Sequence, residues 1–418
     1  MPKLVIEGGK SLKGEIKLQG AKNSVLPILA ATILSEEESV IHGCPNLSDV
    51  AITVEILNFL GCKTKFEGES LIINPKNINK NKIPEMYMRK MRSSIIFLGA
   101  LISRMGCAEI SLPGGCELGP RPLDLHFSGL RQLGMISEES HGKIKCNVGR
   151  GLVGNNIVLS FPSVGATENL ILSAVKAKGE TIITNAAREP EIQDLANYLN
   201  KCGAKIRGAG EGTIKIEGVD RLQGAHYSII PDRIAAITYM AATAVTSGDI
   251  LINRVYPEHL SSVIPIFEEC GCIIEIFDKG KLRLIAPERL LSNAVIRTMP
   301  YPGFPTDAQP PIMTMLCAAE GSSIIIENIF ESRYKHVGEL LRLGADIKVE
   351  GRTAIVNGVK RLSGADVRAE DLRGAAALVV AGLCAEGTTK ISGLRHIDRG
   401  YEDIEGNLCK IGANIKRI

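Results

Sequence analysis

The sequence contains no tryptophan, and aromatic residues make up only 4% of its 418 positions. Its core must therefore be filled by Ile, Leu, Val and Ala, and the hydrophobic fraction of 45% is ordinary for a globular protein. The net charge of +3 is too small to indicate a nucleic-acid partner. No apolar run reaches the roughly 18 residues of a membrane span, and the first residues do not form a signal peptide. We therefore expect a cytoplasmic protein that binds neither nucleic acid nor membrane.

Several common site motifs are also missing. The sequence has no CxxC pair with zinc spacing, and its 7 histidines show no metal-ligand spacing. It also lacks GxGxxG after a strand, the phosphate-binding P-loop and the GxSxG nucleophile turn. The 11 cysteines are odd in number and fall mostly at apolar positions, which favours reduced thiols. We therefore expect no metal and no cofactor.

One pattern is present six times. An apolar run ends at a glycine that a small or soft residue follows, at Gly61, Gly134, Gly203, Gly271, Gly344 and Gly412. The spacing of roughly 70 residues exceeds that of a solenoid repeat, so each copy is a supersecondary module. Short alternating stretches and helical stretches predict the order β-α-β-α-β-β for each module. The second copy is the least regular, because its opening at 79–87 does not alternate cleanly.

The first helix of each module is Ala-rich and apolar nearly all round, which predicts a buried helix. The clearest examples are predicted over Leu26–Leu34, Thr167–Ala177, Ile234–Thr246 and Ala375–Cys384. The chain is longer than one typical core, so we expect two domains with three modules each.

The turns before these helices differ between copies, and this is where Lys and Arg gather. They contain Lys22-Asn23, Arg89–Arg92, Ser163–Gly165, Asp232-Arg233, Phe304–Asp307 and Asp371–Arg373. Helix N-termini offer free N–H groups and the positive end of the dipole, so several such ends with Lys and Arg favour a polyanionic ligand.

Some polar residues have simpler explanations. We interpret Asp49, Asp194 and Asp366 as helix caps, since Asp before a helix is usually an N-cap. We interpret His126 and His396 as structural, although both follow Arg-bearing turns and orienting those turns is the alternative.

The stretch 112–122 is the most unusual part of the chain. Its eleven residues include three Gly and three Pro, which is incompatible with a helix or a central strand and predicts an exposed mobile loop. Cys116 in this loop is not a core thiol. Nearby cations such as Arg121 favour a lowered thiol pKa and hence a nucleophile or an acid, and an idle loop cysteine is the alternative.

Seven segments together resemble a known family. They are 20–24, 113–126, 163–167, 188–191, 231–233, 305–307 and 396–401. Over essentially the whole chain the sequence resembles the enolpyruvyl transferases that act on UDP-N-acetylglucosamine in peptidoglycan precursor synthesis. The Cys loop is specific to these enzymes, whereas the shikimate-pathway enolpyruvyl transferase shares only the general architecture.

The resemblance implies an α/β fold: a two-domain inside-out α/β barrel built from six β-α-β-α-β-β repeats. The first domain would comprise 20–228 and carry the loop 112–122. The second would comprise 1–19 with 229–418, and the substrates would lie between the two domains. The resemblance also implies transfer of the enolpyruvyl group from phosphoenolpyruvate to the sugar 3-hydroxyl, with release of phosphate, through a tetrahedral ketal.

The implied site residues fall into three groups. Phosphoenolpyruvate would be bound by basic side chains, namely Lys22, Arg121 and Arg399, with support from Arg92, Arg333 and Arg373. The reacting groups would be served by Asp307 as base or orienter of the hydroxyl, by Asn23 as hydrogen-bonding partner, and by Cys116 as general acid or product-release residue. The UDP-sugar would contact Pro122, Leu123, Asp124, Ser163, Val164, Gly165 and Ile329.

One departure from the family pattern stands out. Some members carry Lys where this chain has Phe161, so a cationic contact to the diphosphate is absent or comes from another residue. Two alternatives remain: a shikimate-pathway transferase, and a non-catalytic UDP-sugar-binding paralogue. We expect a monomer, and inactivation by an epoxide phosphonate such as fosfomycin through Cys116.

Overall fold

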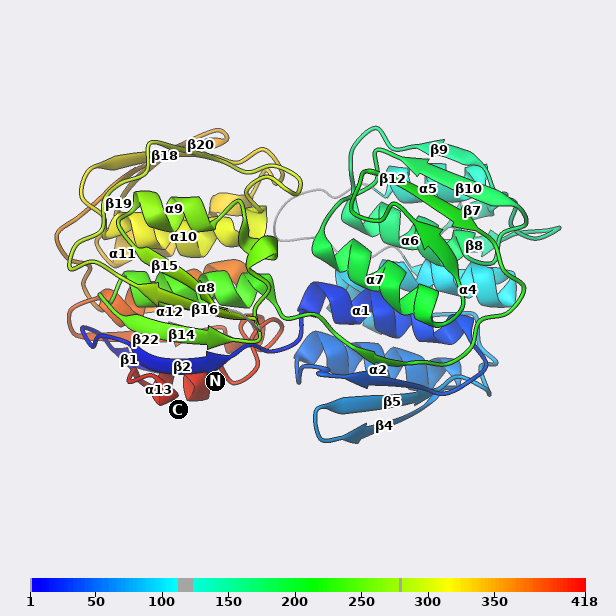
Figure 1. Ribbon diagram of the computed structural model, residues 1–418, viewed down its shortest axis with the longest axis horizontal. Coiled ribbons are helices and arrows are strands. Elements are labelled where there is room, and N and C mark those ends of the chain that lie inside the picture. The colour runs from blue at the N-terminus through cyan, green and yellow to red at the C-terminus, as the bar shows by residue number, and fades with distance from the viewer. Residues whose placement is uncertain (1, 112–122, 278–279) are drawn as a thin grey trace. The chain divides into compact units, whose positions relative to one another are not determined.

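Helices and strands alternate along the whole chain in the computed structural model, which describes residues 2–111, 123–277 and 280–418 (Figure 1). By internal contacts the chain divides into two compact units. One unit comprises Gly20 to Ile230, and the other joins the residues up to Gln19 to Pro231–Ile418. The helices found in the described residues include none long and apolar enough to cross a membrane.

The strands of the Gly20–Ile230 unit form three sheets within its described residues. One has the order β13 (His226–Ser228), β3 (Ser39–His42), β5 (Ser70–Asn74) and β4 (Lys63–Glu67). The next has the order β9 (Asn156–Val158), β10 (Glu180–Thr184), β12 (Thr213–Glu217) and β11 (Lys205–Arg207). The last is shorter: β6 (Cys107–Ser111), β8 (Lys143–Asn147) and β7 (Ile136–Ser140).

The other unit repeats this arrangement in its described part. One sheet has the order β2 (Lys13–Lys17), β14 (Asp249–Asn253), β16 (Lys281–Ile285) and β15 (Ile273–Phe277). The next has the order β17 (Val295–Arg297), β18 (Ser322–Ile326), β20 (Thr353–Asn357) and β19 (Asp346–Glu350). The last has the order β21 (Asp366–Arg368), β22 (Thr388–Ser392), β1 (Leu4–Glu7) and β23 (Asn414–Arg417). In each four-stranded sheet of the described chain, the strand given first in the orders above is parallel to its neighbour, and the other pairs are antiparallel.

The shorter sheet explains why the second copy is irregular in sequence. No strand opens that module within the described residues; a single parallel bridge joins Lys82 to Glu109 at the edge of β6. The segment continues into α3 (Glu85–Lys90) and a 3-10 turn, η2 (Arg92–Ile96). The lack of alternation at 79–87 therefore corresponds to a missing strand.

Each module contains the two helices that its sequence pattern predicts. The first helix of each module is α1 (Lys22–Ala31), α4 (Phe97–Met105), α6 (Val164–Ala174), α8 (Arg233–Ala244), α10 (Gln309–Cys317) or α12 (Leu372–Cys384). Every residue of α8 and α10 is buried, which fits their small and apolar composition. The second helices are α2 (Ser48–Leu60), α5 (Asp124–Gln132), α7 (Pro190–Lys201), α9 (Ile264–Glu269), α11 (Val337–Arg342) and α13 (Ile404–Lys410).

The six marker glycines share one backbone conformation. All have positive φ, between 89° at Gly344 and 111° at Gly61, and each follows a second helix. A glycine in the left-handed region commonly ends a helix, because residues with a Cβ adopt this conformation only at a cost. The repeated sequence marker is thus a repeated helix stop.

The helix ends agree with the sequence-based predictions within three residues, and the helix starts lie one to four residues before the predicted ones. The sequence places Lys22, Val164 and Arg373 in turns that precede helices, and this is wrong. In the structure these residues form the first helical turns of α1, α6 and α12. Lys and Arg are unfavourable at the positive end of a helix dipole, so the sequence gives no signal that a helix begins at Lys22 or Arg373.

Candidate active site

Lys22 begins α1 and is nearly buried. Its Nζ lies 2.9 Å from Oδ2 of Asp49, a fully buried residue in the first turn of α2. The N-terminus of α1 contributes free N–H groups and the positive end of the helix dipole at the same place. Asn23 is the next residue of the same turn. This corner therefore places a lysine, an amide and the free N–H groups of a helix start close together.

His126 connects three further predicted site residues. Burial lowers its pKa to about 4, with Arg92 lowering it further and Asp124 opposing the shift, so the imidazole is neutral near pH 7. Its Nδ1 accepts from the Asn169 amide at 2.9 Å. A Cβ added at Gly165 would lie 3.1 Å from the ring, so the ring packs directly against the start of α6. His126 therefore supports the turn that carries Gly165, and the choice between a structural and an orienting role stays a prediction.

Ser163 caps α6 by accepting from the Ala166 N–H at 3.4 Å. Val164 and Gly165 form the first turn of this helix, so their N–H groups have no acceptor within it. Such a turn binds phosphate oxygens well. The nearby Phe161 side chain is 44% exposed and brings no charge.

In the other unit, Asp307 lies between two buried arginines. Arg333 donates from Nη2 to Asp307 Oδ1 at 2.9 Å and also to the carbonyl of Thr306. Arg373 donates from Nε and Nη2 to Asp307 Oδ2 at 3.2 and 3.1 Å. The Asp307 side chain is 28% exposed, whereas the arginines are 1% and 4% exposed. Both carboxylate oxygens are thus oriented, and the carboxylate still reaches solvent.

Asp371 completes a charge-balanced quartet with these three residues. It caps α12 through the N–H groups of Arg373 and Gly374, and its Oδ1 lies 4.0 Å from Arg333. Burial lowers the pKa of the neighbouring His336 to about 4, although Asp371 opposes the shift. A Cβ at Gly374 would lie 2.5 Å from Asp371 Oδ2, so only glycine fits there.

Ile329 is tied to the Asp307 turn through Glu327. The buried Glu327 carboxylate accepts from the N–H of Ile329 at 2.8 Å and from that of Phe330 at 3.0 Å. Its other oxygen accepts from the Thr306 hydroxyl at 3.0 Å. One acidic side chain therefore fixes both segments.

Arg399 is half-buried in the turn after η6 (Leu394–His396). Gln19 holds this turn from both sides: its amide donates to the Gly400 carbonyl at 3.0 Å, and its oxygen accepts from the Glu402 N–H at 2.7 Å. The segment before residue 20 thus helps to shape the Arg399 turn.

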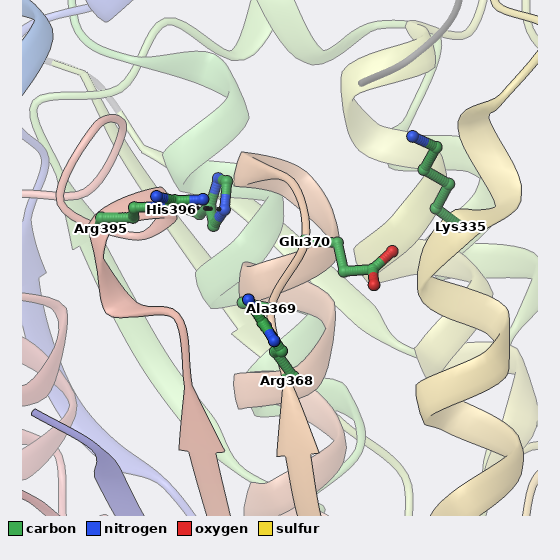
Figure 2. Close-up of a pocket in the computed structure, with 6 residues that line it drawn as sticks. All are labelled: Lys335, Arg368, Ala369, Glu370, Arg395 and His396. Carbon is green, nitrogen blue, oxygen red and sulfur yellow. Dashed lines mark hydrogen bonds between the residues drawn. The ribbon is translucent and has the colours of Figure 1, made fainter. Parts of the chain in front are cut away.

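A cavity of about 340 Å³ lies in the same unit (Figure 2). It is lined by Lys335, Arg368, Ala369, Glu370, Arg395 and His396. Figure 2 shows Arg395 and His396 together at one side and Glu370 directed toward Lys335 at the other. The cavity contains three cationic side chains, Lys335, Arg368 and Arg395, which form no ion pair with the described residues. Glu370 is the one carboxylate among the lining residues. An anion would restore the charge balance.

The structure groups many of the predicted residues and leaves others apart. Asp307, Arg333 and Arg373 are in direct contact, and Arg92 and Asp124 act on the same histidine. Cys116, Arg121 and Pro122 lie outside the described residues. Within the described residues no group of three or more His, Cys, Asp or Glu side chains can hold a metal ion.

The predictions of helix caps for three aspartates are wrong. Asp49 pairs with Lys22, Asp194 lies inside α7, and Asp366 begins β21 near Lys3. Sequence reasoning also missed Glu327 and His336 as supports of the site. Glu327 gives a sequence signal as a polar residue within an otherwise apolar stretch, but this signal names no partner, and His336 follows polar residues that give no such signal.

Comparison with known proteins gives the family. The family model for EPSP synthase (3-phosphoshikimate 1-carboxyvinyltransferase) matches residues 6–408. UDP-N-acetylglucosamine 1-carboxyvinyltransferase 2 of Caldanaerobacter subterraneus subsp. tengcongensis is 52% identical, with 100% of each chain covered. UDP-N-acetylglucosamine 1-carboxyvinyltransferase 1 of Carboxydothermus hydrogenoformans is 50% identical over 100% of this chain and 99% of its own. The Finegoldia magna enzyme is 46% identical, with the same coverage.

Solved structures agree at the level of the fold. The enolpyruvyl transferase NikO from Streptomyces tendae has a TM-score of 0.89 at 24% identity, with 100% of this chain and 98% of that chain covered. EPSP synthase from Acinetobacter baumannii has a TM-score of 0.77 at 18% identity, with both chains fully covered. The fold and the matched model define a mixed α/β transferase of the EPSP synthase family. Within this family the chain belongs to the UDP-N-acetylglucosamine 1-carboxyvinyltransferases.

Proposed function

We propose that the protein transfers the enolpyruvyl group of phosphoenolpyruvate to the 3-hydroxyl of UDP-N-acetylglucosamine and releases phosphate. The names of full-length relatives at 46–52% identity carry this proposal. We further propose that it acts in the cytoplasm as a monomer without metal or cofactor. The reaction would be the first committed step of peptidoglycan precursor synthesis, on which cell wall growth, cell shape and division depend.

We also propose that the fold is a pair of inside-out barrels made from six copies of one module. Six left-handed glycines after second helices and the repeated strand order support this description. The complete burial of α8 and α10 supports the placement of helices inside and sheets outside.

The chemistry is an addition followed by an elimination. The sugar 3-oxygen bonds to C2 of phosphoenolpyruvate while its hydroxyl proton leaves and a proton joins C3, which gives the ketal. Loss of a proton from C3 and breakage of the bond from C2 to the phosphate oxygen then give the enol ether and free phosphate. Such a path requires cations around the phosphate and carboxylate, a group at the hydroxyl and an acid near C3.

For the first unit we assign the binding of phosphoenolpyruvate to Lys22 and Asn23, with Arg92 in support. The ion pair with Asp49 fixes the Lys22 ammonium at the start of α1, where the free N–H groups of the first turn are further donors for an anion. Arg121 would add a bidentate contact, and Cys116 would be the acid or the product-release residue.

For the other unit we assign Asp307 to the sugar hydroxyl as base or orienter. Arg333 and Arg373 hold both of its oxygens, which supports a fixed direction toward the hydroxyl. Arg399 would bind phosphoenolpyruvate. The cationic cavity that Figure 2 shows would raise the local concentration of anionic substrates.

The nucleotide would be bound by N–H groups and apolar contacts. We assign the diphosphate to the N-cap Ser163 with Val164 and Gly165 of the first turn of α6, and the uracil to Leu123 and Asp124. Ile329 would lie near the UDP-sugar. Because Phe161 offers no charge, the N–H groups of α6 would carry more of the diphosphate binding than in relatives with a lysine there.

Phosphate release from phosphoenolpyruvate, with each acceptor offered separately, tests the proposal. UDP-N-acetylglucosamine should support turnover and shikimate 3-phosphate should not. The matched family model bears the name of the shikimate enzyme, so this acceptor is the appropriate competitor. Turnover with shikimate 3-phosphate alone would contradict the proposed acceptor, and tight UDP-sugar binding without phosphate release would favour the non-catalytic paralogue.

A further inference from the structure

Asp194 lies inside α7, is 1% exposed, and belongs to none of the groups assigned above. Its Oδ1 accepts from the Tyr227 hydroxyl at 2.6 Å. Its Oδ2 accepts from the Ser24 hydroxyl and from the N–H of Ile230 at 3.4 Å. One buried carboxylate thus joins three segments that are far apart in the sequence.

Ser24 is the connection to the proposed site. It is fully buried and is the third residue of α1, directly after Lys22 and Asn23. The start of α1 is held from a second side as well, because the Ala21 N–H donates to the Ile230 carbonyl at 2.8 Å. Asp194 therefore fixes the first turn of α1 both directly and through Ile230.

This arrangement is costly for a residue that only fills space. Burial raises the pKa of Asp194, and the hydrogen bonds from Ser24, Tyr227 and Ile230 oppose that shift. An apolar side chain of similar size would avoid the desolvation of a carboxylate. Hydrogen bonds to a charged acceptor are directional and stronger than neutral ones, so they define the position of Ser24 closely.

We propose that Asp194 is a positioning residue for phosphoenolpyruvate binding. It acts through Ser24, orients the first turn of α1, and so directs Lys22 and Asn23 toward the substrate. This inference rests on the proposed function. Asp194 itself does not touch the substrate.

Two substitutions separate positioning from general stability. Ser24→Ala and Tyr227→Phe each remove one hydrogen bond from the same carboxylate, so both should lower the melting temperature by similar amounts. Only Ser24 belongs to α1. We expect Ser24→Ala to raise the KM for phosphoenolpyruvate about five- to tenfold with little change in the KM for UDP-N-acetylglucosamine. Tyr227→Phe should leave both KM values within about twofold of the wild type.

Changes at Asp194 test whether Ser24 acts through this contact. Asp194→Ala should reproduce the Ser24→Ala effect, and the double variant should be no worse than Asp194→Ala alone, because both changes remove one interaction. Asp194→Asn should restore much of the wild-type KM, since its amide oxygen still accepts from Ser24 and the Tyr227 hydroxyl can accept from its NH₂.

The outcomes are distinguishable. Equal changes in the KM for phosphoenolpyruvate in Ser24→Ala and Tyr227→Phe would overturn the positioning role. Additive effects of Ser24→Ala and Asp194→Ala on this KM would also overturn it. In both cases normal turnover by the wild type would leave the proposed function intact. Absence of turnover by the wild type would overturn the proposed function, and this inference with it.

Discussion

Asp307→Asn tests the charge balance of the buried quartet. The change keeps the shape of the side chain but removes the carboxylate that accepts from both Arg333 and Arg373. Breaking a buried ion pair costs about 3–5 kcal/mol, and the 28% exposure of Asp307 places the expected loss near the lower end, at about 3 kcal/mol. In a unit of this size that loss lowers the melting temperature by roughly 6–12 °C.

The matched control is Asp398→Asn, which removes a carboxylate from an exposed arginine pair. Asp398 accepts from Arg417 at 2.8 Å, but the two side chains are 40% and 33% exposed, so the loss should stay below about 1 kcal/mol. Thermal unfolding of the variants and of the wild type measures both effects. Turnover should fall about a hundredfold or more in Asp307→Asn only. Equal stability losses in the two variants would refute the argument from burial.

Three further predictions concern a carboxyl, a thiol and an arginine. Burial, together with Glu191 and Glu189, raises the pKa of Glu168, so the folded state keeps a proton that the unfolded chain loses as pH rises, and this costs stability at higher pH. The stability of Glu168→Gln relative to wild type, measured by urea unfolding, should therefore be greater at pH 8 than at pH 5. An equal difference between the two proteins at both pH values would contradict this. Peptide mapping after brief alkylation should find Cys116 labelled before the exposed Cys409, and the opposite order would remove the reason to regard Cys116 as special. Arg399→Ala should cut turnover severely without change in the far-UV circular dichroism spectrum, and near-normal turnover would count against its role.

The repeated architecture could be predicted because its signals are local. A glycine after an apolar run indicates the end of a helix, and this signal lies within a few neighbouring residues. Ala-rich stretches without a polar face likewise indicate buried helices. Helix starts were predicted less well, because a polar first turn such as the one at Lys22 is hard to distinguish from a loop.

The partners of the site residues could not be predicted, because they depend on contacts between distant segments. The sequence predicts a helix cap at Asp49, yet this residue pairs with Lys22 across 27 positions of the sequence. Arg373 reaches Asp307 from 66 positions away, and Asp194 reaches Ser24 from 170. Buried thiols such as Cys270 and Cys272, whose pKa burial raises to about 12, could be predicted as core residues from their apolar context alone.

The most direct test of the account is the identity of the product. Isotope-labelled phosphoenolpyruvate and UDP-N-acetylglucosamine should give a vinyl ether at the sugar 3-oxygen, visible by NMR, with one phosphate released for each ether formed. Phosphate release without this ether, or an ether formed only on shikimate 3-phosphate, would contradict the account.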